Sequence, residues 1–130
     1  MVLVGGTERG QAIVELSLAL TVLLILGLGL IDAGRVLSAY VTVTNASREG
    51  ARVAALGYAD TQIQIAVSHS LTVLTANGVE TLISPASSER QRGEPVTVEV
   101  RVPVEILFPG YGSFATNPVT VTARTVMRME

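Results

Sequence analysis

Residues 8–32 read ERGQAIVELSLALTVLLILGLGLID, and this stretch decides what kind of fold the chain can adopt. Within residues 16–31 only Ser17 and Thr21 are polar. A helix that is apolar on every side must be buried in protein or in lipid, and the rest of the chain is too short to surround it. The twenty residues 12–31 make a helix of about 30 Å, long enough to cross a bilayer. The stretch therefore predicts a membrane-spanning helix.

A cleaved secretory signal is the competing interpretation of this segment. Such a signal has a basic start and a small-x-small cleavage site after its apolar run. The leader MVLVGGTERG carries one arginine and one glutamate, and no A-x-A motif follows Ile31. Removal after the run is therefore disfavoured. Cleavage before the run, between Gly10 and Gln11, leaves a chain that keeps its apolar segment with Glu15 as its fifth residue.

Composition excludes several classes of protein. The 130 residues include nine arginines, no lysine and 11 acidic residues, for a net charge of -2 without a basic block. A nucleic-acid partner is not expected, because phosphate binding needs clustered positive charge. There is no cysteine, so the chain has neither a disulfide nor a thiolate nucleophile. Apolar residues make up 48% of the chain and are concentrated in one segment, which predicts one modest head domain.

The helix is predicted to continue beyond the apolar run. In residues 32–57 apolar residues recur at spacings of three and four with arginines between them, which predicts one helix from about Gln11 to Leu56 that ends at Gly57. The apolar positions expected on its inner face are Val36, Tyr40, Val43, Ala46, Val53 and Leu56.

A second helix and three strands are predicted in the remainder. Asp60 is the expected N-cap of a helix over residues 61–76 that stops at Asn77–Gly78. Residues 79–84 form a weak strand, and the apolar alternation of residues 95–106 and 118–129 predicts two stronger ones. Their expected inward side chains are Val96, Val98, Val100, Val102, Val104, Val119, Val121, Ala123 and Met127; Thr97, Glu99, Arg101, Glu105, Thr120, Thr122 and Arg124 face solvent. Pro103 places its strand at an edge or bulge.

The predicted fold class is α+β. A long N-terminal hydrophobic helix continues into a small head, in which a second helix packs on an antiparallel sheet of about three strands. The domain boundaries are a leader at 1–10, a transmembrane or filament-core helix at 11–31, an amphipathic continuation at 32–57 and the head at 58–130.

Two connecting loops are predicted. Residues 85–95 form a mobile surface loop by composition. Residues 108–118 contain Phe108, Tyr111 and Phe114, which either pin a hairpin connection onto the sheet or form a contact tip.

Three blocks of sequence carry a family resemblance. RGQAIVELSLAL (9–20), LGLGLIDAGR (26–35) and NASREGARVAALG (45–57) together resemble the TadE-like proteins of tight-adherence pili, within the type IV pilin and pseudopilin superfamily. Many TadE-like sequences carry a proline where this chain has Thr21. Threonine keeps its backbone N–H, so a kink is not expected there.

The resemblance implies processing and assembly. A prepilin peptidase of the membrane cuts after Gly10, and the new α-amino group of Gln11 pairs with Glu15 of a neighbouring subunit to fix the register. The alternative is that Glu15 is an interfacial residue at the headgroups, since an isolated carboxylate in an apolar setting needs a partner or a proton.

Other residues are assembly candidates with competing explanations. Gly27 and Gly29 either allow local unwinding or, with Gly34, allow close helix packing. Arg35, Arg48, Glu49 and Arg52 either form salt bridges between subunits or belong to an exposed helix face, with Glu49 and Arg52 paired along it.

Catalysis is not predicted. His69, the only histidine, lies in the second predicted helix between two serines that do not face it. Neither a metal-binding motif nor a phosphate-binding glycine loop is present, and no cofactor is expected.

The predicted function is that of a structural subunit of a type IV or Tad-type filament. The chain is in the inner membrane as a precursor and then at the cell surface, where its partners are further copies or other pilins. The alternative is a membrane-anchored minor pseudopilin or accessory protein that does not form the filament shaft.

Overall fold

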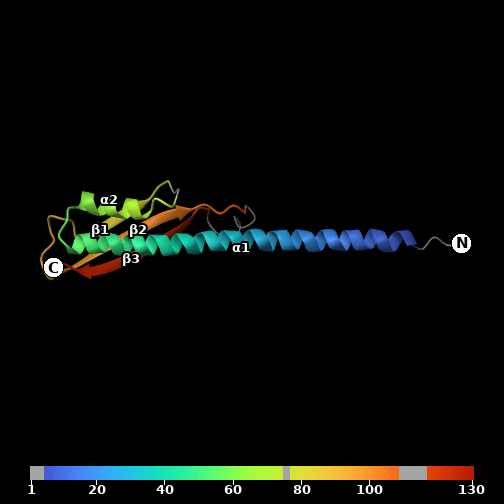
Figure 1. Ribbon diagram of the computed structural model, residues 1–130, viewed down its shortest axis with the longest axis horizontal. Helices are drawn as coiled ribbons and strands as arrows, with labels where there is room; N and C mark the ends of the chain where they lie inside the picture. The colour runs from blue at the N-terminus through green and yellow to red at the C-terminus, as the bar shows by residue number, and fades with distance from the viewer. Residues whose placement is uncertain (1–4, 75–76, 109–116) are drawn as a thin grey trace.

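The computed structural model describes residues 5–74, 77–108 and 117–130. One long helix runs the length of the molecule, and a shorter helix and a sheet pack against its C-terminal half (Figure 1). The predicted α+β class is confirmed. In chain order the elements are α1 (Gly5–Ala55), α2 (Asp60–Ser70), β1 (Glu80–Ser84), β2 (Pro95–Val104) and β3 (Val119–Arg128).

Helix α1 is a single helix across both the apolar segment and the head. It begins at Gly5, earlier than the predicted start near Gln11. The leader contains no proline, and each residue added to an existing helix gains a backbone hydrogen bond. Its end agrees with the prediction: Gly57 has φ +83 and its N–H donates to the Ala54 carbonyl at 3.0 Å. This left-handed conformation favours glycine.

The two hydroxyl residues of the apolar segment are satisfied within the helix. The Ser17 hydroxyl donates to the Ile13 carbonyl, and the Thr21 hydroxyl donates to the Ser17 carbonyl, each at 2.8 Å. Such bonds to the preceding turn hide the hydroxyl dipole. Helix α1 continues through Thr21 without a break, so residues 16–31 present an apolar surface on which both hydroxyl groups are paired.

The sheet has the order β1-β2-β3, with both pairs antiparallel. The predicted alternation is confirmed: Val96, Val98, Val100 and Val102 are buried, whereas the side chains between them are at least partly exposed. Strand β2 is central, but β1 pairs only as far as Glu80 with Arg101. At Pro103 the strand pairs only with β3, through Thr120, so a missing N–H is tolerated there.

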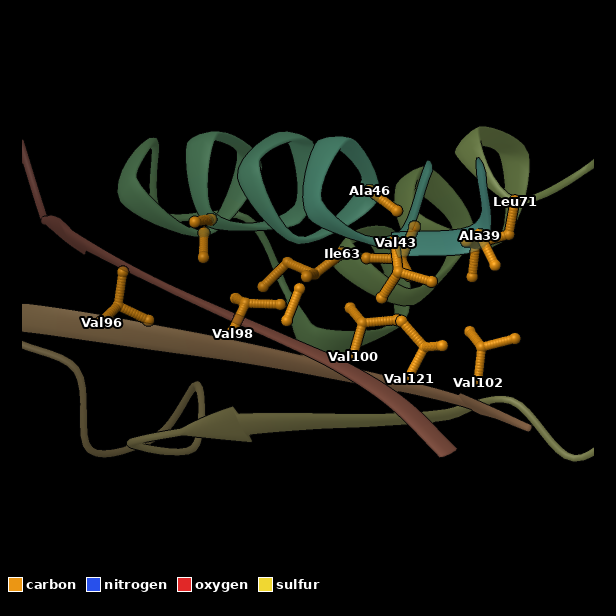
Figure 2. Packing of buried hydrophobic residues seen from close by; sticks show 14 residues of the cluster. Ala39, Val43, Ala46, Ile63, Leu71, Val96, Val98, Val100, Val102 and Val121 are labelled. Atoms are coloured by element: carbon orange, nitrogen blue, oxygen red, sulfur yellow. The ribbon is translucent and has the colours of Figure 1, made fainter. Parts of the chain in front are cut away.

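The core lies between α1, α2 and the inner face of the sheet (Figure 2). Most contributions of α1 are small residues, and of the predicted inner positions only Val43 and Ala46 are fully buried. Tyr40 and Leu56, expected on the inner face, are about half exposed, and Val36 and Val53 are only partly buried. The fully buried positions allow α1 to approach the sheet closely. On α1 these positions are Ala39, Val43, Ala46, Ser47, Gly50, Ala51 and Ala54.

Gly50 is the point of closest approach. A Cβ placed there would lie 2.7 Å from Val67 Cγ2 and 3.1 Å from Val98 Cγ1. The first distance is shorter than any ordinary carbon contact. Helix α1 therefore meets α2 and β2 at the same position, and only glycine fits between them.

A buried polar contact joins α1 to both long strands. The Ser47 hydroxyl is fully buried and donates to the Val98 carbonyl at 2.9 Å. It also lies 2.8 Å from the Thr125 hydroxyl. Because each buried polar group must find a partner, this contact fixes the axial position of α1 over the sheet.

Helix α2 differs from its prediction at both ends. The N-cap is Ala59, not Asp60, and the helix ends at Ser70, earlier than the predicted residue 76. Near that end the hydroxyls of Ser68, Ser70 and Thr72 donate to carbonyls three or four residues earlier. Such bonds compete with the helical ladder.

The carboxylate of Asp60 binds the connection between β1 and β2 instead of capping α2. Arg90, whose side chain is 2% exposed, donates to Asp60 Oδ1 and, at 3.0 Å, to the carbonyls of Tyr58 and Pro85. The other oxygen of Asp60 accepts the Ser87 N–H at 3.3 Å. Arg90 thus ties residues 85–95, predicted to be a mobile surface loop, to the turn between the helices.

Candidate assembly surface

The N-terminal half of α1 is an apolar surface that the head leaves uncovered. Within Gly10–Ala55 the most apolar stretch has a mean hydropathy of 2.4 and none of it is buried. Its large side chains are exposed, and this half of the helix projects from the head (Figure 1). They are Ile13, Val14, Leu16, Leu18, Leu20, Val22, Leu23, Leu24, Ile25, Leu26, Leu28, Leu30 and Ile31. This surface indicates membrane anchoring.

The predicted processing site lies inside α1. Gly10 and Gln11 are both exposed and helical, and a Cβ at Gly10 would meet nothing within 4 Å. The head therefore does not cover this position. Cleavage between them remains a prediction.

Glu15 is exposed on the same helix. Among residues 10–31 it is the only charged side chain, and the described part of the chain supplies no hydrogen bond or ion pair to it. In lipid this carboxylate needs a proton or a partner. Its role in subunit register remains a prediction.

The glycines of α1 are accommodated in regular helix. Gly27, Gly29 and Gly34 all lie within α1, so this chain on its own is not unwound there. A Cβ at Gly27 or Gly34 would meet nothing within 4 Å. The head therefore does not require these two glycines, and close packing against another helix stays a prediction.

Asp32 joins the end of the apolar segment to the head. Its side chain is almost fully buried, and its two carboxylate oxygens accept the N–H groups of Leu107 and Phe108, each at 3.0 Å. Arg35 lies one turn further along, 3.6 Å from the same carboxylate. The connection after β2 is thereby held at a fixed height on α1. In the sequence Asp32 is only the residue that closes the apolar run; its bonding cannot be read from local pattern.

We expect Asp32→Ala to lower the free energy of unfolding of the head by about 2 kcal/mol, because two backbone N–H groups lose their acceptor. Asp32→Asn keeps one acceptor oxygen and should lose less. Urea unfolding of the full chain in detergent micelles measures both. Glu105→Ala, which removes an exposed carboxylate nearby, is the control. Equal stability of Asp32→Ala and the control would contradict this role.

The charged candidates further along α1 are mostly paired within the chain. Arg52 donates to both oxygens of Glu49, at 2.7 and 3.0 Å, which confirms the predicted pair along the helix. Arg48 is exposed. Salt bridges between subunits remain a prediction for Arg35, Arg48, Glu49 and Arg52.

The Glu49–Arg52 pair is pH-dependent. The hydrogen bond from Arg52 holds the pKa of the Glu49 carboxyl below its usual value. Since the folded pKa is the lower one, the pair stabilises the helix above the unfolded pKa and this contribution is lost as pH falls through the folded pKa. We expect Arg52→Gln to raise the Glu49 pKa, measured by NMR titration. An unchanged pKa would mean that the pair does not form in solution.

The remaining candidates are the histidine of the second helix and the aromatic residues of the connection after β2. His69 lies on α2, as predicted, and is exposed. Phe108 is half-buried, and its N–H is held by Asp32, whereas Tyr111 and Phe114 lie outside the described residues. The Asn117 side chain accepts a hydrogen bond from the Ile106 N–H at 3.1 Å and donates one to the Ile106 carbonyl at 3.3 Å. Among the described side chains, no three acidic or histidine residues are grouped to hold a metal ion.

The arrangement defines a class of protein. It is an α+β head carried on a helix whose other half bears a long, uncovered apolar segment, as in pilin-like proteins.

The family comparison agrees with this class. The model of the family described as TadE-like protein matches residues 10–52. The match begins at the glycine before the predicted cleavage site and covers α1 almost to its end, about a third of the chain. It confirms the resemblance found in the sequence and is consistent with a TadE-like, pilin-like protein associated with tight-adherence pili. This family is structural rather than catalytic. No curated protein and no solved structure matches the chain.

Proposed function

We propose that the chain is a structural subunit of a Tad-type filament, cleaved after Gly10 and assembled through α1. The observation that carries the proposal is the uncovered apolar half of α1, which is rigidly continuous with the head. A filament of such chains can cover this half with copies of itself and leave the heads outside.

Removal from lipid needs more than hydrophobicity. Lipid tails are as apolar as leucine, so exchanging lipid for neighbouring helices gains little from the hydrophobic effect. A polar group that is unpaired in lipid and paired in the filament favours transfer of the helix from the membrane into the filament. Glu15 is such a group, and cleavage supplies the α-amino group of Gln11 as its partner. The pair contributes chiefly to register.

The proposed location and partners follow from this role. The precursor resides in the inner membrane, where a prepilin peptidase is its first partner. The mature chain then joins further copies or other pilins at the cell surface.

The test compares sheared extracellular material with membranes from the native cell, using intact mass and N-terminal sequencing. We expect chains that begin at Gln11 in the sheared fibres. Chains that begin at Met1 and remain in membranes would overturn the proposal and leave a membrane-anchored accessory protein.

A pair of variants tests the role of Glu15. We expect Glu15→Ala to abolish release of fibres although the chain is still made, and Glu94→Ala, which removes an exposed carboxylate of the head, to leave release unchanged. Fibres from Glu15→Ala at the normal level would contradict the register role.

A further inference from the structure

The exposed apolar surface of α1 does not stop where the membrane segment ends. Beyond Ile31, Leu37, Tyr40 and Val41 are still 64%, 53% and 54% exposed. The twenty residues 12–31 already match the thickness of a bilayer. Further along, the exposed positions Asn45, Arg48 and Arg52 are polar. Lipid cannot cover the apolar residues that lie at the height of the head.

These residues complete a heptad pattern that begins in the apolar segment. Leucines recur every seven residues, and between them lies a second series in which three of five members are alanine. Every member of both series is exposed. The series are Leu16, Leu23, Leu30 and Leu37, and Ala12, Ala19, Leu26, Ala33 and Tyr40. Such a stripe is the contact line of coiled coils; we name these nine residues the seam.

The seam also borders a groove on the head. The α1 side of the groove includes Ala33, Leu37 and Tyr40, and the opposite side is formed by residues 119–122 of β3. Its volume is about 710 Å³. Asp32 lines it too, but its carboxylate is engaged with Leu107 and Phe108. The groove therefore offers an uncharged, largely apolar surface to a helix that lies on the seam.

We infer that the seam joins copies of this chain as parallel helices staggered by half a heptad, about 5 Å. The inference rests on the proposed function, in which all copies are inserted in the same direction. At this stagger each leucine of one copy lies level with a member of the other series: Leu16 with Ala12, Leu23 with Ala19 and Leu37 with Ala33. Large residues thus meet small ones along most of the seam, which lets the helices approach closely.

Charge supports the stagger over an unshifted pair. Glu15 is next to the seam, and an unshifted pair would leave both Glu15 carboxylates at the same height in an apolar setting, level with each other and not with a positive group. A shift of about four residues instead brings Glu15 level with Gln11 of the neighbour, where cleavage creates an amino group. The same shift therefore satisfies both the packing and the carboxylate.

A staggered contact does not close on itself. In a bundle, each seam faces the axis and touches one neighbour displaced toward the head and another displaced away from it. A contact of this head-to-tail type continues as an open helical array. The seam thus gives the proposed filament its axial step.

Cysteine pairs test the stagger without background, because the chain has no cysteine of its own. In the double variant Ala33→Cys/Leu37→Cys, mild oxidation of filament-bearing cells should give a ladder of disulfide-linked chains on non-reducing gels. Each single variant should stay monomeric. A bond within one helix is not expected, since Cβ atoms four residues apart lie about 5–6 Å from each other and a disulfide needs about 4 Å.

A matched control uses the same spacing off the seam. Gly34 and Ser38 are both exposed, one residue further around α1, about 100° away. The variant Gly34→Cys/Ser38→Cys should give no ladder. Dimers from either single variant would show an unshifted pair, and equal ladders from both double variants, or none from Ala33→Cys/Leu37→Cys in released fibres, would also overturn the inference.

Release of fibres is measured in the same cells, which separates the two proposals. Released fibres without the ladder contradict the seam and leave the filament role intact. A ladder that is found only in membranes, without released fibres, contradicts the filament role and supports the seam.

Discussion

Gly50→Leu is expected to lower the free energy of unfolding of the head by about 3 kcal/mol, the largest effect of a substitution on α1. Even a Cβ at this position would lie 2.7 Å from Val67 Cγ2 and 3.1 Å from Val98 Cγ1. Both valines are fully buried, so neither can turn aside into solvent. A leucine forces α1 away from α2 and β2 and opens gaps along the rest of the interface.

Gly50→Ala separates steric crowding from helix propensity. Alanine favours a helix over glycine by about 1 kcal/mol, which offsets part of the crowding, so we expect a net loss of about 1 kcal/mol. Urea unfolding of the full chain in detergent micelles, followed by circular dichroism, measures both variants. Gly34→Leu is the control, because a Cβ there meets nothing within 4 Å. A Gly50→Leu protein as stable as the control would contradict the close approach.

Arg90→Ala is expected to have a similarly large effect, about 3 kcal/mol. Its guanidinium is almost completely buried and binds Asp60 and the carbonyls of Tyr58 and Pro85. Removal of one partner of a buried pair leaves the other partners without compensation. The Asp60 side chain is about one third exposed, so water can replace part of the interaction that Asp60 loses with Arg90. The expected loss of stability is therefore at the lower end of the range for broken buried ion pairs.

Arg90→Lys tests whether the planar guanidinium group matters as well as the positive charge. A lysine cannot reach three acceptors in that geometry, so we expect it to recover less than half of the loss. Arg92→Ala, two residues away and exposed, is the control and should be neutral. Hydrogen exchange at the Ser87 amide should accelerate in Arg90→Ala, since this amide donates to Asp60. Equal stability of Arg90→Ala and Arg92→Ala would show that the connection between β1 and β2 does not depend on the contacts of Arg90.

The elements with a strong pattern could be predicted from sequence. The apolar run of α1 is almost continuous over residues 16–31 and the valines of β2 alternate along the strand, so neighbouring residues reinforce the same conclusion. The end of α1 at Gly57 was predictable because glycine is the residue that adopts a positive φ at low cost.

The contacts between elements could not be predicted in this way. The buried face of α1 consists mostly of alanine, serine and glycine, with Val43 as a larger member, whereas Tyr40 and Leu56, which dominate the hydrophobic pattern, are about half exposed. Burial of small residues depends on how closely another element approaches, which is a property of the whole fold.

The partners of Asp60 and Asp32 could not be predicted from the sequence either. Asp60 stands where local preference predicts a helix cap, but Arg90, thirty residues away in the chain, takes its carboxylate. Asp32 marks the end of the apolar run in sequence, and only the fold brings the backbone of Leu107 and Phe108 to it. Partners distant in sequence decide the role of both carboxylates.

The unbroken path of α1 from the apolar segment into the head has a rotational consequence. No loop separates the two halves, so in the proposed filament the direction in which the sheet points would be set by the side of the helix that faces the axis. One residue inserted near Gly27 would turn the head by about 100° relative to that side, whereas seven would turn it by only about 20°. The angular phase of the head, and with it the outer surface that a fibre presents, is therefore encoded in the number of residues between Glu15 and Asp32.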